Sequence, residues 1–281
     1  MAWLRRHSKQ VILFACLTIL ALLWLIPVLW AISTSLKPNP HTYRYPPRWI
    51  PEQVTLQNFK EVFFTIRTTP IWRAYINSLI VSLSTTALVL VVSSLAAYAL
   101  ARFDFPGRNL VFGIIVSSLL IPGQITLVPV FLRLYRWGWL NTYKALIVPG
   151  LAGPFGVFLL RQFMLSIPRD LEDAARIDGC SKFRTFYSIV IPLIKPALTT
   201  LGIFTFFGSW NDFMWPLIVM TKRNMMTLPV ALQAYLAAFN YMIEAGYILA
   251  ASVAATVPPA IFFLIFRRYI VEGITLSGLK L

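Results

Sequence analysis

Charged residues are scarce in this chain of 281 residues: only 12% are charged, whereas 58% are hydrophobic. A soluble globular domain carries about 25% charged residues, so the composition argues against a soluble globular chain. Runs of about twenty apolar residues recur along the sequence, and such runs indicate helices that cross a membrane. The sequence therefore predicts an all-α membrane protein, in which residues 1–281 form a single transmembrane domain.

Cysteine and histidine are equally rare, with two residues of each. Cys16 lies in the first apolar run and Cys180 in a polar stretch, so no disulfide framework follows. His7 and His41 are far apart in the sequence, and no metal-ligand spacing surrounds either of them. No nucleophile–base pairing is evident. We therefore predict no metal site, no catalytic residue and no enzymatic activity for this chain.

A nucleotide-binding loop of the Walker A type is also lacking. The stretch Gly273…Gly278-Leu279-Lys280 approaches its spacing, but Leu279 separates the Gly from the Lys, and no strand–helix context follows. If ATP drives this protein, another chain must bind it.

Acidic residues number 10 against 25 basic ones, which gives a net charge of +15. A charge of this size can indicate nucleic acid, but here the basic residues lie in short loops between the apolar runs. Membrane topology and contact with anionic lipid headgroups explain that distribution more simply. We expect membrane lipid, and no nucleic acid, as a partner.

The apolar runs predict six spans. A basic stretch at Arg5–Lys9 precedes the first span and keeps the N-terminus in the cytoplasm, so six crossings place the C-terminus there too. Pro122-Gly123, Pro149 and Pro258-Pro259 predict kinks or breaks. The predicted spans are about 11–32, 75–100, 110–132, 145–165, 196–220 and 247–266, with an extracytoplasmic arm at 33–73, a cytoplasmic loop at 166–192 and a cytoplasmic tail at 267–281.

The loop at 166–192 is the longest interior polar patch. Pro168 suits the first position of a helix whose first turn is rich in carboxylates. Gly179 can end this helix in the left-handed conformation, and Ser181 can cap a second helix. The patch is thus predicted to form a helix–Gly–helix elbow, or alternatively an amphipathic elbow on the membrane surface. Four apolar residues of the second helix are predicted to share one face: Phe183, Phe186, Tyr187 and Val190.

This elbow resembles the signature loop of the permease subunits of bacterial ABC importers. That loop reads Glu-Ala-Ala, three residues, Gly, nine residues, Ile, one residue and Leu-Pro, and every spacing is kept here. Asp173 replaces the Glu and Ile191 replaces the Leu. The resemblance implies that the elbow docks into a cleft on a separate ATPase and transmits its motion to the spans. The implied coupling residues are Glu172, Asp173, Ala174, Ala175, Arg176, Asp178, Gly179, Phe183, Ile189 and Pro192.

The whole chain is similar to the second permease of carbohydrate importers of the maltose-permease type. Asn77-Ser78-Leu79, Ala97–Arg102, Trp210-Asn211-Asp212 and Arg268–Gly273 carry this wider resemblance, whereas Arg267 stands where Gln is usual. It implies import of a sugar or sugar-like solute, such as an oligosaccharide, a disaccharide or a polyol derivative, by alternating access across the bacterial inner membrane. The implied partners are a second permease in a heterodimer, two ATPase subunits that hold ATP and Mg, and an extracytoplasmic solute-binding protein. This chain itself is expected to bind no cofactor.

Other candidate residues lie along the pathway and at the outer face. Gln124, Trp210 and Asn211 can supply the hydrogen bonds and aromatic surface that suit a sugar. Placing the charged side chain of Asp212 so close to the hydrocarbon is costly in free energy, so we interpret this residue as either a functional residue or a helix cap at the water boundary. By position in the family, Glu272–Leu281 is a second candidate contact with the ATPases. The candidate contact with the binding protein is the loop of Asn224, Met225, Met226, Thr227, Leu228 and Pro229.

A secondary transporter or a channel is the alternative from another class. Such a protein would require ionisable residues deep in the spans or paired inverted halves. Neither is found in the sequence, and the elbow has no role in that alternative.

Overall fold

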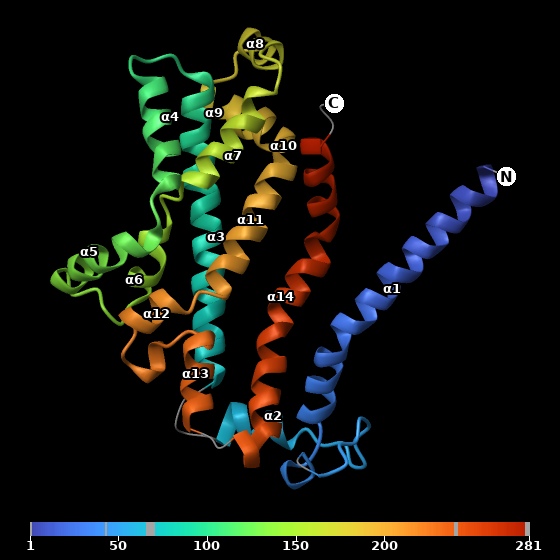
Figure 1. Ribbon diagram of the computed structural model, residues 1–281. Coiled ribbons are helices and arrows are strands. Elements are labelled where there is room, and N and C mark those ends of the chain that lie inside the picture. The colour runs from blue at the N-terminus through green and yellow to red at the C-terminus, as the bar shows by residue number, and fades with distance from the viewer. Residues whose placement is uncertain (1, 43, 66–70, 239–240, 279–281) are drawn as a thin grey trace. The chain divides into compact units, whose positions relative to one another are not determined.

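The computed structural model describes residues 2–42, 44–65, 71–238 and 241–278, and every regular element within these ranges is a helix (Figure 1). Contacts within the chain divide it into two compact units. One unit comprises Met1–Trp72 with Ala231–Thr256, and the other comprises Arg73–Val230 with Val257–Leu281. Each unit is described by itself.

The first unit begins with α1 (Ala2–Ser35) and continues with a short arm. The apolar part of α1, Val11–Ser35, is long enough to cross a membrane, and within it only Thr34 and Ser35, at its C-terminal end, are buried within the chain. Its apolar side chains are therefore available to lipid or to another subunit. The arm holds η1 (Asn39–His41), a short helix α2 (Gln57–Lys60) and η2 (Glu61–Thr65).

The buried face of this short helix is not the side that carries Leu56. Asn58 and Val62 are the buried residues, at 2% and 0% exposure, whereas Leu56 is 69% exposed. The amide of Asn58 explains this orientation, because it donates to the carbonyl oxygens of Ser35 and Lys37, both at 2.7 Å. Two buried hydrogen bonds to the chain that follows α1 thus set the rotation of α2.

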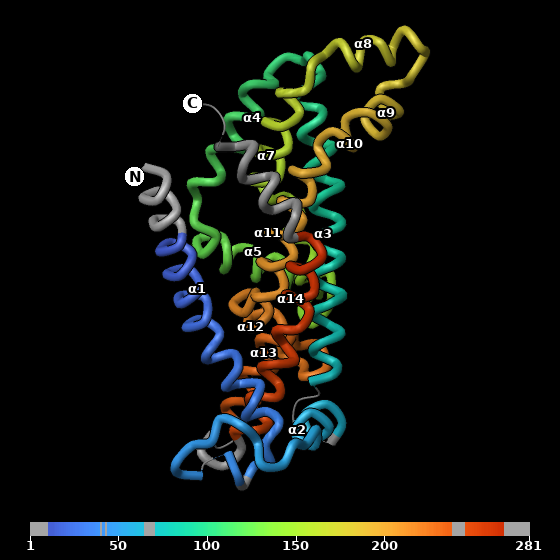
Figure 2. Tube along the Cα trace, turned by 90° about the vertical axis from the view of Figure 1, so that its right-hand side faces the viewer, coloured from blue at the N-terminus to red at the C-terminus, as the bar shows by residue number. Residues whose placement is uncertain are grey.

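The second unit is built around α3 (Ile71–Arg102), a helix of 32 residues without Gly or Pro. Its buried side chains form a core with α7 (Pro154–Leu165), η5 (Phe186–Val190), α10 (Ile191–Leu193) and α11 (Lys195–Trp210). Figure 2 shows α3 running unbroken alongside α11. Most hydroxyl residues of α3 are buried, as a packing role predicts: Ser78, Ser82, Thr85, Thr86, Ser93 and Ser94.

The predicted third span, 110–132, is broken more sharply than a kink. Helix α4 (Arg108–Ser117) runs into η3 (Ser118–Leu120), and α5 (Gly123–Arg136) then leaves at an angle of 101°. Ile121 is extended, with ψ of 115°, as a residue before proline prefers. Pro122 itself has no N–H with which to continue the helix. Figure 1 shows α5 turned away from the line of α4.

The predicted fourth span, 145–165, has the expected kink. Helix α6 (Tyr143–Ile147) and η4 (Val148–Gly150) meet α7 at 43°. Gly156 provides the close packing that the small residues predict, because a Cβ there would lie 2.5 Å from the Ser93 hydroxyl oxygen.

The predicted fifth span, 196–220, is not a single continuous helix. Helix α11 ends at Trp210, and α12 (Met214–Val219) follows after a break. Asp212 accepts a hydrogen bond from the Trp215 amide at 3.4 Å. Short polar side chains compete in this way for backbone groups and favour helix ends over helix interiors.

The C-terminal part comprises η6 (Arg223–Met225), α13 (Leu228–Ala238) and α14 (Tyr241–Gly278). Helix α14 contains the predicted sixth span, 247–266, and continues to Gly278. The predicted tail is therefore helical over residues 267–278, and residues 279–281 lie outside the described residues. Within the described part, three helices are long and apolar enough to cross a membrane, and up to six crossings result if each of three bent pairs is one span.

Candidate functional site

The polar elbow begins with α8 (Asp170–Ile177), which starts two residues after Pro168. Its C-terminus closes as a Schellman motif: the Cys180 amide donates to the Ala175 carbonyl at 2.9 Å, and the Gly179 amide donates to the Arg176 carbonyl at 3.0 Å. Gly179 has a φ of +80°, so its predicted left-handed conformation is confirmed. The predicted cap of the second helix, α9 (Lys182–Thr185), is also confirmed, because the Ser181 hydroxyl accepts from the Arg184 amide.

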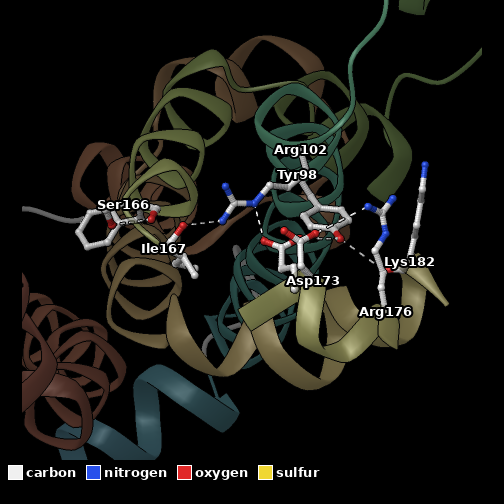
Figure 3. A network of polar contacts seen from close by, with 9 residues as sticks. Tyr98, Arg102, Ser166, Ile167, Asp173, Arg176 and Lys182 are labelled. Carbon is white, nitrogen blue, oxygen red and sulfur yellow. Dashed lines mark hydrogen bonds and ion pairs between the residues drawn. The ribbon is translucent and has the colours of Figure 1, made fainter. Parts of the chain in front are cut away.

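A buried ion pair holds the elbow to the end of α3. The Nε atom of Arg102 lies 2.5 Å from Oε1 of Glu172, and the two side chains are 6% and 12% exposed. Arg102 also donates to the Ile167 carbonyl at 3.0 Å. The Tyr98 hydroxyl donates to Glu172 at 3.3 Å and lies 3.4 Å from the Lys182 carbonyl oxygen. In Figure 3, Tyr98 and Arg102 point from α3 towards the elbow.

Because Glu172 and Ala175 lie one turn apart, they share the inward face of α8. Ala175 is 5% exposed. The opposite face carries Asp173, Ala174 and Ile177, and Ile177 is 88% exposed. The ten residues predicted to couple to an ATPase are therefore divided between a structural face and an accessible face.

The four apolar residues of the second helix do not share one face, contrary to prediction. Phe186 and Val190 are buried at 6% and 0% exposure, whereas Phe183 and Tyr187 are exposed at 70% and 69%. Phe183 and Tyr187 are four positions apart, as are Phe186 and Val190, but the second pair is offset from the first by three positions. In addition, residues 186–190 form a π-turn, which changes the helical pitch. The outer surface of the elbow thus presents Phe183 and Tyr187 together with Ile177.

The remaining predicted coupling residues lie at the surface of the elbow or at its rim. Arg176 and Asp173 form an exposed ion pair at 3.8 Å. Asp178 and Pro192 are exposed, whereas Ile189 is half-buried.

A cavity of about 530 Å³ lies at the breaks of the helices. Gln124 enters it from the start of α5, and Asp212 from the break between α11 and α12. The structure therefore brings these two predicted pathway residues to one site. The complete lining is Thr85, Gly123, Gln124, Thr126, Leu127, Val130, Leu146, Pro149, Gly150, Thr205, Gly208, Ser209, Asp212, Met214 and Trp215.

The other two predicted pathway residues do not line this cavity. Trp210 is 3% exposed and packs edge-on against Tyr75, with ring centroids 5.7 Å apart. The Asn211 side chain donates to the Phe207 carbonyl of its own helix at 3.0 Å. Sequence reasoning missed Trp215 and Ser209, which line the cavity instead. Ser209 reaches it from the end of α11, and Trp215 reaches it from α12, beyond the break after Trp210.

The structure bears on the helix-cap alternative for Asp212, whereas a functional role stays a prediction. Its Oδ1 atom accepts from the Trp215 amide, and the residue also lines the cavity. The indole N–H of Trp215 donates to the Ala145 carbonyl at 2.8 Å, so the ring has a fixed orientation beside Asp212.

The loop predicted to contact a binding protein is tied to the other end of α3. The amide of Asn77 donates to the carbonyl oxygens of Asn224 and Met226 at 3.0 and 2.9 Å. The Tyr143 hydroxyl donates to the Asn77 side-chain oxygen at 2.7 Å. The Leu228 amide donates to the Ser78 hydroxyl at 2.8 Å. The loop is therefore held in place, and Asn224 remains exposed at its start, whereas Thr227 is buried.

Within the described ranges, the structure contains no group of three His, Cys, Asp or Glu side chains that could hold a metal ion.

Comparisons with known proteins concern almost the entire chain. Residues 89–275 match the family of binding-protein-dependent transport system inner membrane components. The arabinooligosaccharides transport system permease protein AraQ of Halalkalibacterium halodurans is 37% identical over 93% of both chains. The trehalose/maltose transport system permease protein MalG of Thermococcus litoralis is 35% identical over 97% of both chains.

A solved structure of a bacterial ABC transporter involved in the import of the acidic polysaccharide alginate has the same fold. Its TM-score is 0.82 at 22% identity, with 94% of this chain and 96% of that chain covered.

Proposed function

The chain belongs to the family of binding-protein-dependent transport system inner membrane components, and from this premise we propose that it is a transmembrane permease subunit of an ATP-driven importer for a sugar or sugar-like solute. The two curated relatives named above are permeases for saccharides, and both match along nearly their whole length. Another relative, 31% identical, is the sn-glycerol-3-phosphate transport system permease protein UgpE of Salmonella typhi, so family membership alone does not decide the charge of the solute.

The elbow is the observation that carries this proposal. It presents an apolar surface at Ile177, Phe183 and Tyr187, which are 88%, 70% and 69% exposed. Exposed large apolar side chains grouped on a polar segment favour an interaction site. The Arg102–Glu172 ion pair supports this surface from beneath, so a force on the elbow would reach α3. We assign this surface to contact with a separate ATPase subunit, which would bind ATP and Mg and carry out the hydrolysis.

We further propose six crossings, with both termini and the elbow in the cytoplasm. The arm at 33–73 and the loop at 224–229 would then face the outside, where the loop would meet a solute-binding protein. A second permease would complete a heterodimer. Helix 267–278 with residues 279–281 would add a second contact to the ATPases.

In the proposed mechanism, closure of the ATPase dimer moves the docked elbow, and the spans change between an inward-open and an outward-open arrangement. The cavity at the helix breaks would form part of the solute pathway. Gln124 and Asp212 would contact the solute directly, whereas Trp210 and Asn211 would support the wall from behind.

The test is a site-directed crosslink to the co-expressed ATPase, in a chain whose Cys16 and Cys180 are replaced by serine. Ala174→Cys lies on the accessible face of α8, and Ala175→Cys, one residue away, lies on the buried face. We expect Ala174→Cys to crosslink with a yield that changes on addition of ATP, and Ala175→Cys to crosslink far less. Absence of a crosslink at position 174 in an intact complex would refute the docking assignment.

A further inference from the structure

The cavity at the helix breaks has an unusual balance of charge. Among the described residues that line it, Asp212 is the one ionisable side chain, and none is Lys, Arg or His. We propose that this cavity accepts a neutral polyhydroxylated solute and discriminates against anionic sugars. The inference rests on the proposed function and adds to it the charge class of the solute.

The argument begins with the cost of desolvating an anion. A carboxylate, phosphate or sulfonate that binds against this lining loses part of its water, and that loss is compensated only beside a cation or several donors. The lining supplies no cation. Anionic solutes are therefore disfavoured whether Asp212 is ionised or protonated, and an ionised Asp212 also repels them directly.

Hydroxyl groups find suitable partners in the same place. A carboxylate offers about four lone-pair sites, and the bond from the Trp215 amide, at 3.4 Å, occupies one of them. The side-chain amide of Gln124 both donates and accepts hydrogen bonds. A solute whose hydroxyls both donate and accept can therefore bridge Asp212 and Gln124, which enter the cavity from different helices.

The apolar part of the lining fits the carbon face of a sugar ring. The Trp215 indole is held by its bond to the Ala145 carbonyl at 2.8 Å, so it presents a fixed flat surface. Ligand pockets typically have volumes of about 300–1,000 Å³, with a mostly apolar wall and a few placed polar groups. The cavity, at about 530 Å³, falls in that range.

The proposal is tested by the chemistry of one introduced cysteine. Ser209→Cys lies in the cavity lining, and Cys16 and Cys180 are replaced by serine. Membranes that carry the full chain with its transport partners are treated with methanethiosulfonates bearing a trimethylammonium, a sulfonate or a methyl group. The methyl reagent, which is neutral, controls for accessibility and folding. Asp212→Asn provides the matched background, because it preserves size and removes the carboxylate.

With each rate divided by the rate of the same reagent with a free thiol in solution, we expect the cationic reagent to label position 209 about tenfold faster than the anionic one. We expect Asp212→Asn to bring this ratio close to one, while the anionic reagent still labels more slowly than the neutral one. We also expect 100 mM maltose to slow labelling by the neutral reagent, and 100 mM glucuronate to leave it unchanged. Faster labelling by the anionic reagent, equal protection by glucuronate, or no protection by maltose would overturn the proposal. The crosslink at position 174 tests the contact with the ATPase and does not depend on the charge preference of the cavity. Either of these two conclusions can therefore fail without the other.

Discussion

At the scale of single residues, the Arg102–Glu172 ion pair stands out because it is buried and joins two functional parts of the chain. Both side chains are almost completely excluded from solvent, at 6% and 12% exposure. Removing one partner of such a pair leaves the other charge buried, which is far more costly than losing an exposed pair.

We therefore predict that Arg102→Met lowers the free energy of unfolding by about 3 kcal/mol. The control is Arg108→Met, which breaks a pair with Asp104, whose side chain is 78% exposed; its cost should stay below about 1 kcal/mol. Equilibrium unfolding in mixed detergent micelles measures both. The double substitution Arg102→Met with Glu172→Met should recover much of the loss, and equal costs for the two single Arg variants would contradict the prediction.

A second residue-scale prediction concerns Gly179. A residue with a Cβ at its φ of +80° costs about 1–2 kcal/mol, although no atom lies within 4 Å of the added methyl group. Gly179→Ala should therefore shift the elbow and lower the ATP-dependent crosslink at position 174 several-fold. Gly107→Ala is the matched control, because Gly107 has a φ of +82° and equally open surroundings outside the elbow. Equal losses in both variants would mean that strain alone, and not elbow geometry, is measured.

These residues differ in how far the sequence could predict them. The left-handed Gly179 and the Ser181 cap follow from local chemistry within a few residues, so spacing alone was sufficient. The Arg102–Glu172 pair joins residues 70 positions apart, and no local pattern marks either as a partner of the other. For the same reason the sequence could not divide α8 into its buried and accessible faces.

At the scale of elements, α3 and the broken helices behave differently. The prolines predicted where α4–α5 and α6–α7 would break, but not by how much, and the two angles are 101° and 43°. The size of each bend is set by the tertiary contacts made after the break. The break at residues 211–213 was missed because apolar residues resume directly after Asn211 and Asp212, so the apolar run reads as one span. Asp212, at this break, also lines the cavity.

The element-scale prediction concerns the loop bound to the outer part of α3. Asn77→Ala removes two hydrogen bonds to backbone carbonyls at 224 and 226. At roughly 1 kcal/mol for each bond, amide exchange at 224–228 should accelerate about tenfold or more. Ser82→Ala is the control, because its hydroxyl bonds only to carbonyls of α3 itself. Hydrogen exchange measured by mass spectrometry distinguishes the two, and unchanged exchange in Asn77→Ala would show that other contacts hold the loop.

At the scale of the whole molecule, the proposed topology has a direct test. Native Cys180 lies in the elbow, and Gln53→Cys lies in the exposed part of the arm. An impermeant thiol reagent should label Gln53→Cys in intact cells and Cys180 only in inside-out vesicles. Labelling of Cys180 from the outside would reverse the assignment of the elbow to the cytoplasm.

One consequence of the architecture concerns α3, which is bound near both ends and contains neither Gly nor Pro. Its anchors at Asn77 and Arg102 are 25 residues apart, or about 38 Å at 1.5 Å per residue. A tilt of 5° at one anchor therefore displaces the other by about 3 Å. Since α3 has no Gly or Pro between the anchors, it forms one rigid connection between the elbow and the loop at 224–229. In the proposed topology, a shift of the elbow on one side of the membrane would therefore move this loop on the other side.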